Sequence, residues 1–169
     1  MDRAKPFCIA KREVWEAYKQ VKANRGAAGV DGQSIEDFDS DLGKNLYRIW
    51  NRMSSGSYFP PPVRRVDIPK GDTGATRPLG IPTVEDRLLQ RAVARILEAV
   101  FEADFLECSY GFRPGCNPHG ALRALRGIIV TKKVGHLFEA DIRGYFNHIQ
   151  HDWLQKMVLI GLQTRSSCA

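Results

Sequence analysis

The segment from Thr83 to Phe101 constrains the fold more than any other part of this 169-residue chain. Thr83 followed three residues later by Asp86 is typical of a helix start, and the apolar residues after it repeat at helical spacing. The apolar face is wider than the stripe of an ordinary surface helix. We therefore predict a long helix that is packed on more than one side, with a face formed by Val84, Leu88, Leu89, Ala92, Val93, Ile96, Leu97, Val100 and Phe101.

Two further helices are predicted before this segment. The first spans residues 11–23, and the sequence at residues 24–26 ends it. The second is opened by a capping box, in which Ser34 is followed three residues later by Asp37, and it runs to about Met53. Its buried residues are expected to be Ile35, Phe38, Leu42, Leu46, Ile49 and Met53.

Between these helices, residues 58–82 have the character of an extended ribbon. Three consecutive prolines, at positions 60–62, enforce an extended entry. Residues 63–68 and 77–82 have the composition of strands, and residues 70–74 between them form a glycine-containing turn. A two-stranded ribbon with basic residues along it is therefore expected to project from the body of the protein.

The remaining residues predict a loop, two helices and one strand. Asn117 followed by Pro118 is typical of a helix start, so a basic helix is expected from there to about Val130. Residues 136–142 have the pattern of a short strand with Phe138, Ala140 and Ile142 on one face, and a last helix begins near Asp152. The fold is therefore expected to mix helices and strands.

The composition of the chain indicates where in the cell the protein is expected and in what state its cysteines are. The longest clean apolar run, Met157 to Leu162, is far shorter than the roughly 20 residues of a membrane span, and no secretory signal follows the first charges. We expect a cytoplasmic protein without a membrane partner, whose four cysteines are reduced thiols. The alternative on spacing alone is a zinc site built from Cys108, Cys116, His148 and His151.

Basic residues gather in one part of the chain. The net charge is +6, but the stretch from Cys108 to Phe138 contains no Asp or Glu. This stretch is either a surface that faces phosphate groups or a solvated helix face, and charge alone does not decide between them. Its five basic residues are Arg113, Arg123, Arg126, Lys132 and Lys133.

Two places along the chain have residues suited to phosphate chemistry. Asp141 ends the predicted strand and precedes Arg143 and a glycine, so it either holds a divalent metal against a phosphate or pairs with Arg143 at the sheet edge. Lys70 and Arg77 flank the ribbon turn, where they either grip a triphosphate or are solvated charges. The chain contains neither a P-loop motif nor a Gly-x-Ser-x-Gly motif.

Four sequence motifs occur in a fixed order: NRGAAGVDG at 24–32, IPKGDTGATRPLGIPT at 68–83, SYGFRPG at 109–115 and EADIRGYFNHI at 139–149. Together they resemble bacterial group II intron reverse transcriptases, also called intron maturases, from about residue 11 to about residue 158. The resemblance implies an α+β fold in which this chain is the fingers and start of the palm of a right-hand polymerase, with an incomplete palm sheet. It implies an amino-terminal helical extension at 1–57, fingers at 58–135 and a partial palm at 136–169.

The resemblance also implies roles for individual residues. Asp141 would be the first palm carboxylate and bind Mg²⁺, helped by the backbone carbonyl of Ile142. Phe146 would lie under the sugar of the incoming nucleotide and exclude a 2′-hydroxyl group. Lys70 and Arg77 would hold the triphosphate.

Further implied contacts are to nucleic acid. Arg113, in the Gly-Phe-Arg-Pro-Gly loop, would be a template contact or a structural contact. The implied partners are an RNA template, a DNA primer or RNA–DNA duplex, deoxynucleoside triphosphates and group II intron RNA. The amino-terminal helices would grip the template.

The sequence also departs from the family pattern. Members carry a second catalytic strand with a Tyr-Ala-Asp-Asp-like motif, yet no Asp-Asp pair occurs here, and Asn147 stands where many members have Asp. These departures, together with the small polar ending at residues 164–169, indicate a truncated or frame-shifted reading frame, or an excised piece of a longer protein. We expect such a chain to be inactive alone, because two-metal catalysis needs several carboxylates.

Three functional hypotheses follow. The first is RNA-directed DNA synthesis by a chain that lacks part of its site, and the second is an RNA or RNA–DNA binding module without chemistry. The third is an unrelated helical interaction protein. In addition, a palm strand without neighbours should expose Phe138, Ala140 and Ile142 and promote self-association.

Overall fold

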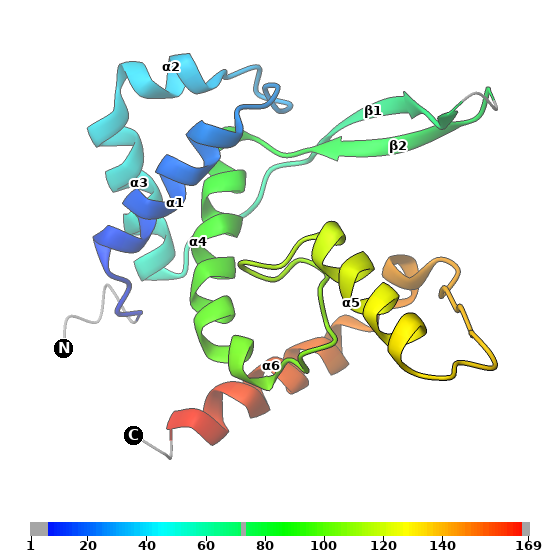
Figure 1. Ribbon diagram of the computed structural model, residues 1–169. Coiled ribbons are helices and arrows are strands. Elements are labelled where there is room, and N and C mark those ends of the chain that lie inside the picture. Colours follow the sequence, from blue (N-terminus) through cyan, green and yellow to red (C-terminus); the bar gives the residue numbers. More distant parts are fainter. Residues whose placement is uncertain (1–6, 72–73, 167–169) are drawn as a thin grey trace. The chain divides into compact units, whose positions relative to one another are not determined.

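The computed structural model describes residues 7–71 and 74–166 and contains two compact units, Met1–Ile96 and Leu97–Ala169. The boundary between the two units falls within helix α4 (Val84–Phe101). This helix is the long helix predicted from the sequence, and its presence confirms that prediction (Figure 1). The end of the polar segment, residues 167–169, lies outside the described residues. The three-part division at residues 57 and 135 stays a prediction.

The first unit is built on helices whose apolar faces meet in one core. Helices α1 (Lys11–Asn24), α2 (Ile35–Ser40) and α3 (Leu42–Ser55) lie around the start of α4 (Figure 1). Because residues three and four apart share one face of a helix, the apolar repeats of the sequence converge there. The buried core consists of Val14, Ala17, Tyr18, Ile35, Phe38, Ile49, Met53, Val84, Leu88 and Ala92.

The helix predicted from Ser34 to about Met53 is interrupted in the structure, where it forms the two helices α2 and α3. The capping box is confirmed, since the Ser34 hydroxyl accepts from the N–H of Asp37 and the Asp37 carboxylate accepts from the N–H of Ser34. The helix that it opens ends at Ser40, however, because Asp41 leaves helical geometry (φ −126°, ψ 39°) before α3 begins. The Asn45 side chain donates to the carbonyl of Phe38 (2.9 Å), which compensates for a backbone bond lost at the break.

The glycine-rich segment at residues 25–33 packs closely against the start of α4. Gly29 is buried, and a Cβ atom placed there would lie 2.6 Å from the backbone nitrogen and Cα of Thr83. Arg87 of α4 also donates from Nη1 to the carbonyl of Arg25 (3.4 Å). The absence of a side chain at Gly29 is therefore what lets this segment lie on the helix.

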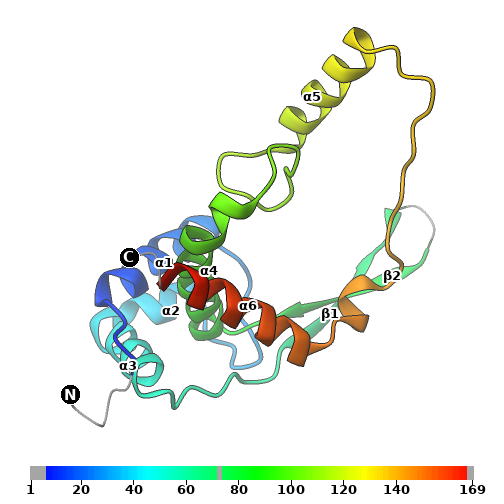
Figure 2. The same ribbon diagram turned by 90° about the horizontal axis from the view of Figure 1, so that it is seen from below.

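The predicted ribbon is confirmed. Strands β1 (Arg64–Pro69) and β2 (Thr76–Ile81) pair antiparallel, with Arg64 opposite Ile81 and Pro69 opposite Thr76. Figures 1 and 2 show the ribbon extending away from the helices of its own unit. Most of its residues are exposed on both faces, which leaves it accessible along its length.

The second unit has the predicted helices but little core. Helix α5 (Pro118–Thr131) starts as expected, since Asn117 Oδ1 accepts a hydrogen bond from the N–H of Gly120 (2.8 Å). The described part of this unit also contains the 3₁₀ turns η2 (Glu102–Asp104) and η3 (Tyr145–His148) and helix α6 (His151–Ser166). No residue of this unit in the described part of the chain is fully buried. The second half of α4 is likewise open, since Val93 and Ile96 are each 40% exposed. Among the described residues, full burial of the predicted apolar face is therefore found only in the first half of α4. In its second half Leu97, Val100 and Phe101 are partly buried, and the Phe101 ring lies beside Gly161 of α6.

The predicted strand at residues 136–142 is wrong. The segment between α5 and η3 has no strand geometry, and Figure 2 shows it as a long open connection within its unit. An isolated strand leaves its backbone groups without partners, and among the described residues only β1 and β2 form a sheet. The predicted apolar exposure is confirmed, with Phe138 91% and Ile142 68% exposed, whereas self-association stays a prediction.

Among the residues that the structure describes, no helix is both long and apolar enough to cross a membrane.

Candidate functional site

The two cations of the ribbon lie at its far end. Arg77 is opposite Ile68 in the ladder, and the N–H of Lys70 donates to the carbonyl of Ala75 (2.7 Å), directly beyond the last strand pair. Gly71 and Gly74 flank the tip with positive φ angles of 57° and 68°, which suit glycine. The structure thus brings Lys70 and Arg77 to one end of an exposed ribbon.

In the second unit, Asp141 introduces a tight turn. Gly144 adopts a left-handed conformation (φ 65°, ψ 27°) and is followed by η3. The N–H of Tyr145 donates to the carbonyl of Ile142 (3.3 Å), and the N–H of Asn147 donates to that of Gly144 (3.0 Å). The turn reverses the chain so that residues before and after it face a common space.

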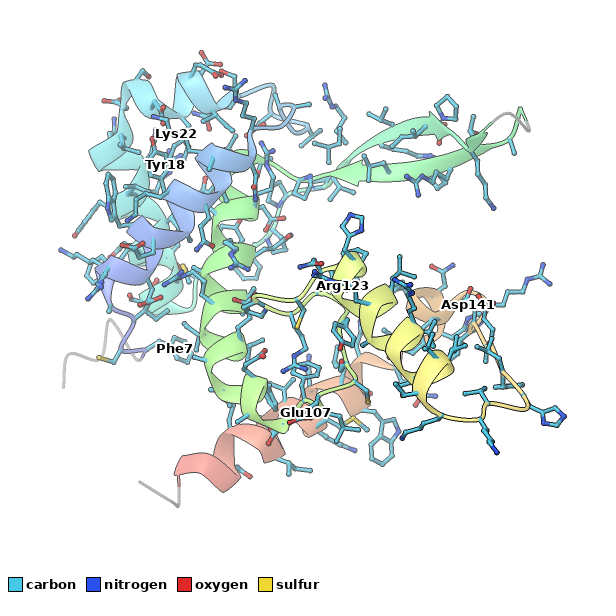
Figure 3. The ribbon with its side chains drawn as sticks, viewed as in Figure 1. Phe7, Tyr18, Lys22, Glu107, Arg123 and Asp141 are labelled. Carbon is cyan, nitrogen blue, oxygen red and sulfur yellow. The ribbon has the colours of Figure 1, made fainter. Side chains whose placement is uncertain are left out.

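That space is an open hollow of about 570 Å³. It is lined by Asp141, Ile142 and Phe146, three of the residues that the sequence singled out, together with Ala140, Gly144, Tyr145 and Asn147. The rings of Tyr145 and Phe146 meet edge to face at 5.3 Å, and Phe146 is 80% exposed. Figure 3 shows Asp141 on this connection beside the turn. The hollow therefore combines a carboxylate with an exposed aromatic ring.

The oxygen atoms at the hollow are of the right kind for Mg²⁺ but too few to hold it. The Asp141 carboxylate is exposed, and in the described part of the chain it makes no ion pair with Arg143, the alternative role considered for it. The Ile142 carbonyl retains a lone pair beside its bond to Tyr145. Magnesium needs near-octahedral oxygen coordination, and one carboxylate with one carbonyl does not supply it.

No zinc site is formed by the residues that the structure describes. Among them, no three His, Cys, Asp or Glu side chains gather in a geometry that would hold a metal ion. Cys108 and Cys116 are free thiols, and His148 instead contacts the carbonyl of Gly144 through Nδ1 (2.7 Å). The zinc alternative therefore finds no support in the geometry.

Arg113 is held by internal contacts. Its guanidinium donates to Oε1 of Glu102 (2.7 and 3.1 Å) and to the carbonyls of Leu106 and Ser109 (both 2.8 Å), and it lies 5.0 Å from the ring centre of Phe105. The hydrogen bond to Glu102 raises the pKa of Arg113 further above its ordinary value. Of the two roles implied for Arg113, the structure displays the structural contact.

Glu102 was not identified from the sequence as the partner of Arg113. The two residues are eleven positions apart with a loop between them, so no helical or strand spacing relates them. The only available signal was the proximity of an acidic cluster, at residues 102–107, to the acid-free stretch.

The other basic residues of the acid-free stretch are exposed. Arg123 and Arg126 are three positions apart on α5, so they share one helix face, and Figure 3 shows Arg123 on this helix. Lys132 and Lys133 follow directly after the helix and are also exposed. These four side chains form what we call the basic stripe, which is open to solvent along its length.

A further charged cluster ties α1 to α2 in the first unit. Lys22 Nζ lies 2.7 Å from Oδ2 of Asp39, and the Tyr18 hydroxyl donates to the same carboxylate (Figure 3). The hydrogen bonds from Lys22 and Tyr18 hold the pKa of Asp39 below its usual value, and the bond to Asp39 raises the pKa of Lys22 to about 12. This cluster is a structural bridge between helices and uses none of the predicted site residues.

Comparison with known proteins shows which family this chain belongs to. Residues 68–165, more than half of the chain, match the family described as reverse transcriptase (RNA-dependent DNA polymerase). The chain belongs to this family. The match contains the ribbon cations, the Gly-Phe-Arg-Pro-Gly loop, the basic stripe and the Asp141 hollow. Reverse transcriptases generally use a divalent metal, typically Mg²⁺.

Individual relatives point to intron-encoded proteins. The chain is 36% identical over 148 residues to the group II intron-encoded protein LtrA of Lactococcus lactis, covering 86% of this chain and 23% of LtrA. It is equally similar to protein YkfC of Escherichia coli, covering 85% of this chain and 39% of that protein. The nuclear intron maturase 1 of Arabidopsis thaliana is 36% identical over 83 residues, 46% of this chain and 11% of the maturase. The chain thus spans well under half the length of each of these relatives.

Proposed function

We propose that this chain supplies the fingers and the beginning of the palm of an RNA-directed DNA polymerase of the group II intron type. The observation that carries the proposal is the hollow at Asp141, where a carboxylate and the exposed Phe146 ring line one space inside the region that matches the family. Such an arrangement suits a site that receives the sugar and phosphates of a nucleotide.

The proposed roles follow from the positions of the side chains. Asp141 and the Ile142 carbonyl provide two of the oxygen ligands of Mg²⁺, and other carboxylates complete the site. Phe146 packs under the sugar and excludes a 2′-hydroxyl group. Arg77 binds the triphosphate with its fork of donors and Lys70 with its mobile ammonium group, because the ribbon exposes this end to solvent.

The basic stripe is the proposed phosphate-binding surface of the second unit. Its side chains are exposed on α5 and directly after it, and an acid-free stretch surrounds them. Arg113 serves this surface indirectly, since its contacts with Glu102 and two carbonyls fix the loop that precedes α5. Residues 1–57 are proposed to grip the template, residues 58–135 to form the fingers and residues 136–169 to begin the palm.

We further propose that the 169-residue polypeptide, tested alone, binds nucleic acid without extending a primer. Two-metal catalysis requires several carboxylates around cations about 3.5–4 Å apart. The described residues contain no such group, and the sequence has no Asp-Asp pair. A non-catalytic RNA or RNA–DNA binding module is therefore the second candidate function, and the missing carboxylates are what favours it.

Magnesium-dependent primer extension on an RNA template tests catalysis. The assay compares the wild-type chain with Asp141→Asn, which keeps the size of the side chain and removes its charge. We expect no extension from either protein. Extension by the wild type that disappears in Asp141→Asn would show that the missing carboxylates are supplied by association, and it would overturn the proposed inactivity.

A salt titration of RNA–DNA duplex binding tests the basic stripe. Arg123→Ala and Arg126→Ala should each reduce the slope of log K against log salt by roughly one unit, because each removes a phosphate contact. The matched control is Lys156→Ala, since Lys156 is an exposed helical cation outside the basic stripe, 4.7 Å from the ring centre of Trp153. Slopes that stay unchanged in both arginine variants would remove the stripe from the binding surface.

A further inference from the structure

The side chain of His148 folds back onto the turn that lines the Asp141 hollow. Its ring nitrogen Nδ1 lies 2.7 Å from the carbonyl oxygen of Gly144. The ring also lies against the backbone at this point, because a Cβ atom placed on Gly144 would be 3.2 Å from Cε1 and 3.3 Å from Nδ1 of His148. The contact therefore combines a hydrogen bond with close packing on a glycine that is itself left-handed (φ 65°).

The chemistry of the two atoms fixes which ring nitrogen carries the proton. A carbonyl oxygen only accepts hydrogen bonds, so Nδ1 of His148 is the donor. A neutral imidazole has a single N–H, so Nε2 is left without a proton in the neutral ring. This state is distinctive, because a solvated histidine without such a contact favours the proton on Nε2.

The turn has few other supports. The 3₁₀ turn η3 contains only four residues, and hydrogen-bond geometry in such turns is poor. All residues from Ala140 to His148 are exposed, so no buried packing holds the turn in place. Within this segment of the described chain, the bond from His148 to Gly144 is the one side-chain hydrogen bond. The shape of the turn therefore depends on His148 together with the backbone bonds.

We propose that His148 is a positioning residue of the nucleotide site, and that it sets the placement of Phe146 relative to Asp141. The Gly144 carbonyl accepts from the N–H of Asn147 (3.0 Å) and from the His148 ring. Phe146 lies between the two residues that the ring contact joins, so closing this contact fixes the direction in which the Phe146 side chain leaves the backbone. His148 itself touches neither nucleotide nor metal in this arrangement.

This role matters because exclusion of a 2′-hydroxyl group requires the ring of Phe146 to lie at a fixed position under the sugar. A site held only loosely by its supporting residues loses this geometry. The inference rests on the proposed function, since it assigns how the aromatic ring of that site is held. The competing interpretation is that His148 is a solvated surface side chain, in which case its ring would not select one tautomer.

The position of the ring proton provides the first test. The full chain, produced with isotopically labelled histidine, is measured by long-range proton–nitrogen NMR at about pH 8, where imidazole side chains are neutral. The signal that disappears in His148→Asn identifies the His148 ring. We expect its proton on Nδ1. A proton on Nε2 would overturn the proposal.

A matched pair of substitutions tests whether the hydrogen bond positions Phe146. His148→Asn keeps an N–H donor at the same number of bonds from the backbone, whereas His148→Leu removes the donor. A fluorinated phenylalanine at position 146 reports the surroundings of that ring by fluorine NMR. We expect the wild-type resonance to be retained in His148→Asn and to shift or broaden in His148→Leu.

Amide exchange gives the size of the effect. Exchange at the N–H of Asn147 should be faster in His148→Leu by roughly 2- to 12-fold, the factor for one net hydrogen bond. The control is His136→Leu, which replaces another exposed histidine of the same unit and should change neither signal. An unchanged resonance in His148→Leu, or an equal change in His148→Leu and His148→Asn, would contradict positioning by the hydrogen bond. Circular dichroism checks that each variant keeps its helices.

The outcomes also separate this inference from the proposed function. The NMR measurements need no nucleic acid, so a Phe146 signal that does not respond to His148→Leu contradicts only the role of His148. The absence of any nucleic-acid binding by the wild type contradicts the proposed function, and with it the nucleotide role of this turn.

Discussion

Replacing Gly29 with alanine tests how the glycine-rich segment is held on α4. Gly29 is buried, and an added Cβ would lie 2.6 Å from the Cα and nitrogen of Thr83 and 2.9 Å from the carbonyl carbon of Pro82. These are backbone atoms, which cannot turn aside as a flexible side chain does. Either residues 25–33 or the start of α4 must therefore move.

The expected cost has two parts. Forcing a methyl group into a packed site typically costs about 1–3 kcal/mol. Movement of Thr83 also weakens the cap of α4, where Thr83 Oγ1 accepts from the N–H of Asp86 (3.2 Å), and a lost cap costs about 1 kcal/mol. We expect Gly29→Ala to destabilise the first unit by about 2–4 kcal/mol, which corresponds to a melting temperature lower by roughly 10–30 °C in a unit of this size.

Thermal unfolding followed by far-ultraviolet circular dichroism measures this effect. The control is Gly43→Ala in α3, where an added Cβ meets nothing within 4 Å. Alanine inside a helix is favoured over glycine, so this variant should gain about 0.5–1 kcal/mol. A Gly29→Ala protein that melts at the wild-type temperature would refute the close packing of the loop on Thr83.

Two other substitutions in the first unit have defined outcomes. Leu88→Ala should cost about 2–5 kcal/mol, measured by urea unfolding, because Leu88 is completely buried in the core and its removal leaves a cavity. Asp39→Asn should reduce the fall in the free energy of unfolding that occurs as the pH is lowered. Hydrogen bonds from Lys22 and Tyr18 hold the pKa of Asp39 low, so its contribution is present above the unfolded pKa of about 3.9 and is lost as the pH falls through the lower folded value. The loss in urea midpoint between neutral and acid pH should be smaller in the variant, and an unchanged loss would contradict the role of this cluster.

Local sequence patterns predict much of this fold because they act over a few residues. The capping box at Ser34, the Asn117 cap and the ribbon strands depend on neighbours three or four positions away or on one turn, and all are present. The break at Asp41 was not predicted, because the apolar repeat continues through it. It depends on the Asn45 side chain, which replaces a backbone bond across seven residues.

Features that depend on distant partners were harder to infer. The strand predicted at residues 136–142 has a suitable alternating pattern, but a strand forms only where another strand takes its hydrogen bonds. The internal contacts of Arg113 likewise depend on Glu102, which no local spacing connects to it. For the candidate site, the residue pattern singled out Asp141, and the family resemblance added Ile142 and Phe146. The turn at Gly144 explains how these three residues line one hollow.

The most direct test of the central claim is the equilibrium binding of the full chain to an RNA template annealed to a DNA primer, measured as a function of salt. A polymerase fragment that grips its substrate through exposed arginines and lysines should bind tightly at low salt and lose affinity steeply as salt rises. Binding that is absent even at low salt, or that does not respond to salt, would contradict the account.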